Sequence, residues 1–119
     1  MIKIKDIKKI LDNIEENCPI LLMGDAVIDF KKDYTNPVNK VRNIDDVREL
    51  VAYYSGIDFL DYPLVIEGLS FLDNKAVFVL LKLVEESELN IILLSKFDKI
   101  SPIILSRIKT KIKYYKEET

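Results

Sequence analysis

Two continuous apolar runs in the second half of the chain place the strongest limit on its fold. Residues 64–66 and 90–95 contain no charged side chain, as expected for strands buried on both faces at the centre of a parallel sheet. Between them, residues 74–86 carry apolar side chains at the three- and four-residue spacing of an amphipathic helix. The sequence therefore predicts an α/β fold with right-handed crossovers and a mainly parallel sheet flanked by helices, in three layers.

Further elements are expected on either side of this unit. Residues 43–54 predict a helix that Asn43 or Asp45 caps, and the helix at 74–86 begins after a cap at Asp73 or Asn74. Residues 101–107 predict a short helix with proline near its start. Residues 109–115 alternate in the manner of an edge strand.

The first half of the chain is less regular. Residues 4–16 have the spacing of an amphipathic helix, and the apolar run 20–23 predicts a short strand. Gly24-Asp25 is a turn signal, after which 26–30 is interpreted as a second strand and 31–39 as a loop. The link at Gly24-Asp25 is too short to join two parallel strands, because a parallel crossover needs a dozen or more residues.

Length and composition indicate one soluble domain covering residues 1–119. About half of the residues are apolar (49%), nearly a third are charged (32%), and the formal net charge is only -2. A protein that grips nucleic acid through a broad face needs clustered Lys and Arg, so we expect weak or no direct nucleic-acid binding. With no signal peptide and no membrane span visible in the sequence, we expect a cytoplasmic protein without a membrane partner.

The content of reactive side chains narrows the chemistry. The chain has one cysteine, Cys18, and no histidine, which excludes an internal disulfide and a cysteine-based zinc site. It also lacks the commonest general base. No carboxylates stand at a spacing that suggests acid–base catalysis, so we expect no metal and no cofactor.

Several segments resemble one family in the same order along the chain. Residues 64–72 followed by 76–86 resemble a strand ending in Asp-Glu that leads into a helix reading Ala-x-x-x-Leu-Leu-Lys-x-x-Glu-Glu. Residues 44–50 are similar to a helix beginning Asp-x-Ile-Arg-Glu-Leu, and 99–107 to a run into Ser-Arg-Cys. These motifs are typical of clamp-loader subunits of the AAA+ superfamily, notably delta-prime and gamma/tau of bacterial DNA polymerase III.

The resemblance implies a reduced AAA+ core without a lid or a collar, and departures from the pattern imply that it is inactive. No Gly-x-x-x-x-Gly-Lys-Ser/Thr loop is present to cradle phosphates. Glu67 stands at the metal-associated Asp of Walker B, and Gly68 replaces the Glu that polarises water. We therefore expect no ATP hydrolysis. For the first half, either 20–23 and 26–30 form a hairpin, or the family's first strand is absent and 4–16 replaces its P-loop helix.

Two further sites follow from the resemblance. Ser106 and Arg107 match the Ser-Arg pair whose arginine acts in trans on a neighbour's ATP, with Ile108 in place of the cysteine. The alternative is that Arg107 only caps a short helix. Phe59 and Leu60 are comparable to a Leu-Phe pair that the delta subunit presents to the sliding clamp. The alternative is that they cover the core beneath a loop.

The functional hypothesis is a non-catalytic, delta-prime-like protein that contacts clamp-loader subunits or the sliding clamp in DNA replication and donates Arg107 in trans. A stand-alone structural or homodimeric α/β protein is the alternative from a different class. A protein that still binds nucleotide without hydrolysing it is the third.

Overall fold

The fold is a five-stranded sheet with the strand order β2-β3-β4-β1-β5, and every pairing in it is parallel. The computed structural model describes residues 12–96 and 99–116. The strands are β1 (Ile20–Gly24), β2 (Val38–Lys40), β3 (Leu64–Glu67), β4 (Ile91–Ser95) and β5 (Thr110–Tyr114). This arrangement confirms the predicted parallel α/β fold.

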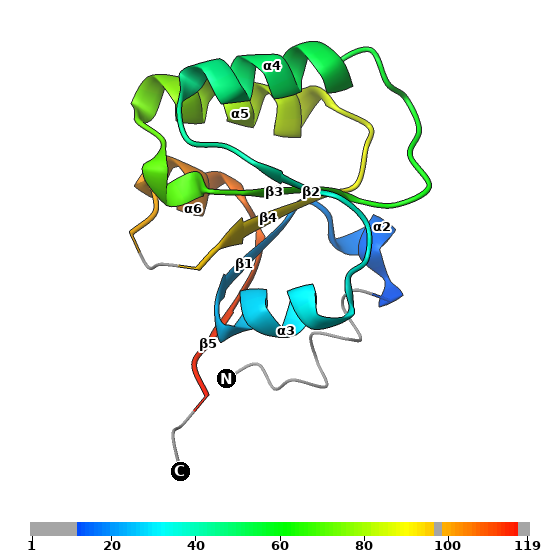
Figure 1. The fold of residues 1–119 in the computed structure, drawn as a ribbon, viewed down its shortest axis with the longest axis vertical. Coiled ribbons are helices and arrows are strands. Elements are labelled where there is room, and N and C mark those ends of the chain that lie inside the picture. Colours follow the sequence, from blue (N-terminus) through cyan, green and yellow to red (C-terminus); the bar gives the residue numbers. More distant parts are fainter. Residues whose placement is uncertain (1–11, 97–98, 117–119) are drawn as a thin grey trace.

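Helices cover both faces of the sheet and make three layers (Figure 1). The helices are α2 (Ile14–Asn17), α3 (Asp25–Asp33), α4 (Ile44–Tyr54), α5 (Asn74–Glu86) and α6 (Pro102–Arg107), with a short 3-10 helix η1 (Leu69–Phe71). Helices α4, α5 and α6 contribute to one core, and α3 contributes to the other. The side chains of the central strands alternate between these two cores, so β1, β3 and β4 are buried on both sides.

The structure confirms that both predicted helices begin with a cap and shows which of the two candidate residues provides each cap. Asn43 accepts a hydrogen bond from the backbone N–H of Asp46 at 3.0 Å, and Asp73 accepts one from Ala76 at 2.9 Å. Each cap satisfies one of the N–H groups that a helix start leaves without an intrahelical partner. The helices at 44–54 and 74–86 therefore begin where the sequence indicated.

The predicted strand at 26–30 is wrong, because these residues belong to helix α3. Gly24 ends β1 with φ of 65°, and α3 begins at the next residue. Ala26, Val27 and Phe30 lie on one face of the helix and are buried against the sheet. Their spacing is helical, but in a run this short it resembles a half-buried strand. The loop predicted at 31–39 contains the end of α3 and the start of β2.

Of the two alternatives for the first half, the hairpin of 20–23 and 26–30 is wrong, whereas the replacement of a P-loop helix by 4–16 falls largely outside the described residues. Strand β1 lies inside the sheet, where Ile20 pairs with Ile92 of β4 and Thr110 of β5. Helix α3 and the segment after it carry the chain from β1 to the far edge, at β2. Of the predicted helix at 4–16, residues 14–16 lie in α2, and residues 4–11 fall outside the described residues. In the part of the chain that the structure describes, no helix has the length and apolar character needed to cross a bilayer.

Candidate functional site

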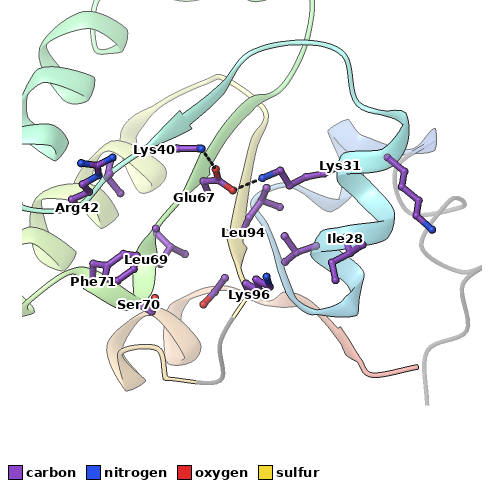
Figure 2. Close-up of a pocket in the computed structure, with 15 residues that line it drawn as sticks. Ile28, Lys31, Lys40, Arg42, Glu67, Leu69, Ser70, Phe71, Leu94 and Lys96 are labelled. Carbon is purple, nitrogen blue, oxygen red and sulfur yellow. Dashed lines mark hydrogen bonds and ion pairs between the residues drawn. The ribbon is translucent and has the colours of Figure 1, made fainter. Parts of the chain in front are cut away.

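A pocket of about 740 Å³ opens at the carboxyl ends of β2, β3 and β4 (Figure 2). Lys40, Glu67 and Ser95 are the last residues of these strands and line it. One wall is helix α3 and another is the turn that leads into η1. Open parallel sheets bind ligands at this edge, and the volume is in the range of small-molecule sites. The pocket is therefore the first candidate for function.

Both apolar and charged side chains line this pocket. The charged residues are Lys31, Lys32, Lys40, Arg42, Lys96 and Glu67. The large apolar residues are Val27, Ile28, Leu69, Phe71 and Leu94. Ile28 and Phe71 come from opposite walls and are 44% and 66% exposed, respectively. The pocket can thus contact an apolar group and an anionic group at the same time.

Glu67, predicted at the Walker-B metal position, forms ion pairs with two lysines. Its carboxylate lies 2.9 Å from the Nζ atom of Lys31 on α3 and 3.7 Å from that of Lys40 on β2 (Figure 2). The two ion pairs join the helix to the edge strand. Among residues 12–96 and 99–116, no group of three or more acidic, cysteine or histidine side chains is placed to hold a metal ion. Glu67 therefore has a structural role in this arrangement.

Gly68, predicted to replace a catalytic Glu, is required by the backbone. Its φ is 99°, which L-residues rarely adopt, and a Cβ atom there would lie 2.0 Å from the carbonyl oxygen of Val41. The backbone N–H of Val41 also donates a 2.9 Å hydrogen bond to the carbonyl of Glu67. The close approach of these two segments leaves no room for a side chain, so this position cannot orient a water molecule.

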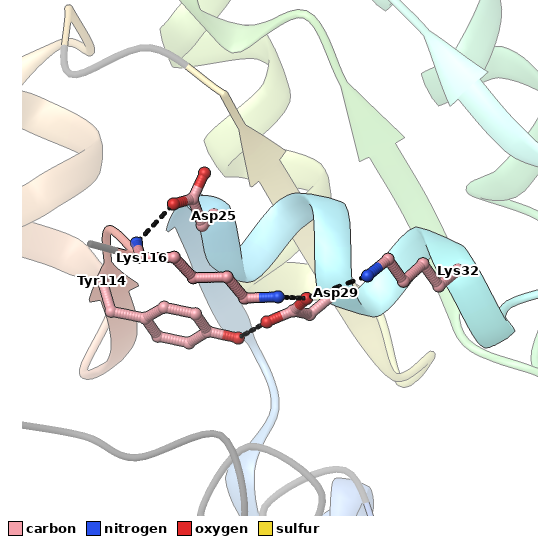
Figure 3. Close-up of polar contacts among 5 residues, drawn as sticks. All are labelled: Asp25, Asp29, Lys32, Tyr114 and Lys116. Carbon is pink, nitrogen blue, oxygen red and sulfur yellow. Dashed lines mark hydrogen bonds and ion pairs between the residues drawn. The ribbon is translucent and has the colours of Figure 1, made fainter. Parts of the chain in front are cut away.

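The end of β1 is closed in a similar way. A Cβ atom on Gly24 would lie 2.6 Å from the carbonyl oxygen of Tyr114. It would also lie 3.0 Å from the ring of Tyr115, which is the lower limit of such contacts. The backbone N–H of Lys116 donates to the carboxylate of Asp25, the first residue of α3 (Figure 3). The segment after β5 thus covers the start of this helix, and no glycine-rich loop stands between β1 and α3.

A polar cluster joins the segment after β5 to α3 (Figure 3). Asp29 accepts hydrogen bonds from the hydroxyl of Tyr114 and from the ammonium of Lys116, and Lys32 lies 3.9 Å away. Burial acts to raise the pKa of Asp29, but the hydrogen bonds from Lys116 and Tyr114 outweigh it and leave this pKa below its usual value. Burial and the same carboxylate raise the pKa of Tyr114. At neutral pH the pair is therefore a carboxylate and a neutral phenol.

The predicted arginine finger lies at the opposite edge of the sheet. Arg107 is the last residue of α6, with its Nη1 atom 3.1 Å from Glu85 and its guanidinium 5.9 Å from the ring centroid of Phe78. The hydroxyl of Ser106 donates to the carbonyl of Ile103 at 2.9 Å. Arg107 is thus remote from the chain's own pocket.

A smaller hollow of about 400 Å³ adjoins Arg107 and contains the single cysteine. Burial raises the pKa of Cys18 to about 11, so the thiol stays protonated at neutral pH. The chain therefore has no activated cysteine nucleophile.

Phe59 and Leu60 behave differently from each other. Phe59 is 76% exposed in the loop between α4 and β3, whereas Leu60 packs against the core beneath α4 and α5. The loop precedes β3 and so lies at the amino edge of the sheet, away from Glu67 and Gly68. The structure does not bring the predicted pairs into a single site.

Sequence reasoning missed the lysines and the arginine of the pocket. Lys31 and Lys32 lie in the segment that was predicted as a loop, where no ligand site was expected. A usable signal was the position of Lys40, Arg42 and Lys96 at or just after the ends of parallel strands, where ligands bind.

Comparison of this chain with protein-family models, curated proteins and solved structures finds no match in any of the three.

Proposed function

We propose that this chain is a non-catalytic, clamp-loader-like protein of the delta-prime type that acts through protein–protein contacts in DNA replication. The observation that carries the proposal is that structural contacts occupy the positions that the family uses for chemistry. Glu67 bridges two lysines, Gly68 has no space for a side chain, and Gly24 leads directly into a helix. A core that keeps its scaffold but cannot hydrolyse ATP is suited to work on a partner.

The sheet is compatible with the AAA+ part of the proposal. Its five strands are all parallel and helices cover both faces, as in the three-layer α/β core that the resemblance implies. The segments that carry the resemblance lie in corresponding elements: residues 44–50 in α4, 64–67 in β3, 76–86 in α5 and 101–107 at α6. This agreement is at the level of fold, and function must be tested separately.

Arg107 is the residue proposed to act on a neighbour. Its side chain is 44% exposed and its partner Glu85 is 52% exposed, so the ion pair between them is a surface pair. Surface ion pairs contribute about 0–1 kcal/mol to stability. Replacing the contact with Glu85 by a contact with the phosphate of a nucleotide bound to another subunit therefore costs little free energy. An arginine supplied in trans stabilises the charge that develops on a transferred phosphoryl group.

One observation favours the second candidate, a structural or homodimeric protein in which the nucleotide role is lost. Arg107 already contacts Glu85 and the ring of Phe78 within its own chain. In that case the arginine fastens α6 to α5 and serves no neighbour. Sedimentation of the purified chain tests the homodimer directly, because a dimer has twice the mass of the single chain.

Capture experiments separate the two candidates. The immobilised chain is expected to retain clamp-loader subunits or the sliding clamp, and an assembled complex is expected to hydrolyse ATP faster. Arg107→Ala should remove most of this stimulation while leaving the fold intact. Arg48→Ala, which alters an exposed arginine on α4, is the matched control and should leave it unchanged. Failure to capture any of these proteins would remove the main support of the proposal.

A Phe59→Ala variant tests the predicted clamp contact in the same experiment. Phe59 is the most exposed large apolar side chain among the described residues. If it is an interface anchor, its truncation should weaken capture of the clamp about tenfold or more. Equal capture by both proteins would assign Phe59 to the free surface.

A further inference from the structure

The pocket at the carboxyl edge of the sheet concentrates positive charge on a chain that is acidic as a whole. The chain carries a formal net charge of -2, yet the pocket is lined by Lys31, Lys32, Lys40, Arg42 and Lys96 against a single carboxylate, that of Glu67. Clustering of one sign in a cleft focuses the field and attracts the opposite charge. The charge distribution therefore indicates an anionic ligand.

The positively charged side chains of the pocket differ in whether they already form an ion pair. Lys31 and Lys40 hold Glu67, and Lys32 lies 3.9 Å from Asp29. The guanidinium of Arg42 and the ammonium of Lys96 have no ion pair with any residue that the structure describes, and both residues are exposed. They come from the ends of β2 and β4, so they stand on two sides of the opening (Figure 2). These two groups are the ones available to a ligand.

The apolar walls point to a ligand that is not purely ionic. Ile28 on α3 and Phe71 on η1 face the pocket from opposite sides, and both are more than a third exposed (Figure 2). Exposed aromatic and aliphatic side chains surrounded by charged residues are typical of protein interfaces, where an apolar centre is encircled by a polar rim. The ligand should therefore carry an apolar side chain beside its negative charges.

The local backbone does not favour a compact phosphate. Helix α3 begins with Asp25, whose negative charge in the first turn disfavours a bound anion at that end of the helix. The segment after β5 closes over Gly24, so no glycine-rich cradle is present there. Positive charge comes from long side chains around an apolar surface, an arrangement that suits carboxylates spread along a flexible peptide.

We propose that this pocket binds a short acidic segment of a partner protein, with an aromatic or aliphatic side chain inserted between Ile28 and Phe71. The carboxylates of the segment pair with Arg42 and Lys96. This inference rests on the proposed function in so far as that function works through protein contacts, and it assigns those contacts a surface and a partner chemistry. The site is remote from Arg107, so the two can be tested independently.

The test uses a fluorescein-labelled peptide of aspartates around one central phenylalanine, followed by anisotropy with the full chain. The double variant Arg42→Glu/Lys96→Glu is expected to weaken binding about a hundredfold, since each lost contact of 1.4 kcal/mol is a factor of ten. Phe71→Ala is expected to weaken it about tenfold. Lys82→Glu changes an exposed lysine on α5, away from this pocket, and should leave the affinity unchanged.

Three control probes make the outcomes decisive. A peptide with lysines in place of aspartates, and one with alanine in place of phenylalanine, should each bind at least about tenfold more weakly. Tighter binding of a single-stranded oligonucleotide or of ATP than of the acidic peptide would overturn the proposal. So would equal peptide affinity of the wild-type chain and of both pocket variants. The double variant and Phe71→Ala alter independent surface positions, so one of them suffices if the other does not fold.

Capture with replication proteins distinguishes this inference from the function on which it rests. If clamp-loader proteins are retained equally by the wild type and the double variant, the proposed function stands and the pocket is not its contact surface. If the acidic peptide binds as described and no clamp-loader protein is captured, the pocket inference stands and the assignment to replication fails.

Discussion

At the scale of single residues, Gly68 shows how a position is fixed by the backbone around it. Its φ of 99° and the carbonyl of Val41 exclude a Cβ atom, so the glycine serves the joining of β2 to the end of β3. Glycine at this position is thus a packing requirement. A Glu introduced here would disrupt the fold, because its Cβ atom would meet the backbone of Val41.

Gly68→Ala is expected to lower the free energy of unfolding by at least about 3 kcal/mol, because it combines a strained φ with a backbone clash. Urea denaturation measures the change. Gly56→Ala is the matched control, since a Cβ atom there meets nothing within 4 Å, and it should be neutral or slightly stabilising. Equal stability of Gly68→Ala and the wild type would contradict the close approach of Val41.

Asp29 provides a pH-dependent prediction. Because its pKa is lower in the folded chain than in the unfolded one, its contribution is present above about pH 4 and is lost as the pH falls through the folded value. Asp29→Asn should therefore cost about 2 kcal/mol at pH 7 and less than that at pH 3, because the contribution decreases as the pH falls below the pKa of the unfolded state. Paired unfolding curves at the two pH values measure this difference.

Asp45 supplies the control for that experiment. Its side chain is 84% exposed and makes only a 3.8 Å pair with Arg48. Asp45→Asn should change stability by less than about 0.5 kcal/mol at either pH. If the cost of Asp29→Asn is the same at both pH values, the hydrogen bonds from Tyr114 and Lys116 are not what stabilises the carboxylate.

At the scale of elements, helices with a recognisable start could be predicted, including the short α6, whereas α3 could not. Helices α4 and α5 have both an Asx cap and an apolar stripe over several turns, and these two signals agree. Helix α3 has Gly24 before it and only three buried side chains, so the turn signal was given more weight than the spacing. Strand β2 has three residues at the edge of the sheet, too few for any periodicity.

The cap of α5 gives a prediction at this scale. Asp73→Ala removes the acceptor for the N–H of Ala76 and is expected to cost about 1 kcal/mol, measured by thermal unfolding. Asp73→Ser keeps an acceptor at the same position and should recover most of the stability. If both variants unfold at the temperature of the wild type, the cap contributes nothing to the helix.

At the scale of the whole molecule, sequence reasoning reached the fold class and part of the candidate site. Glu67 and Gly68 were located because they follow a recognisable buried strand. Arg42 and Lys96 were missed because they are far apart in sequence and line one pocket only when β2 and β4 lie in the same sheet. The strand order decides which strand ends line a common pocket. The hydrophobic periodicity of a single segment predicts a helix or a strand but not the strand order.

The place of β1 in the sheet has a consequence for how the molecule is made. Ile20 pairs with Ile92 on one side and with Thr110 on the other, so both neighbours of this early strand are synthesised late. During synthesis, the apolar strand β1 has no partner strand in this sheet until β4 has been made. Pairing across such separations is slow and leaves strand edges open to aggregation. The sheet is therefore completed only after β5 has been synthesised, and the folding yield in a cell should respond to chaperones that shield residues 12–90 of the nascent chain.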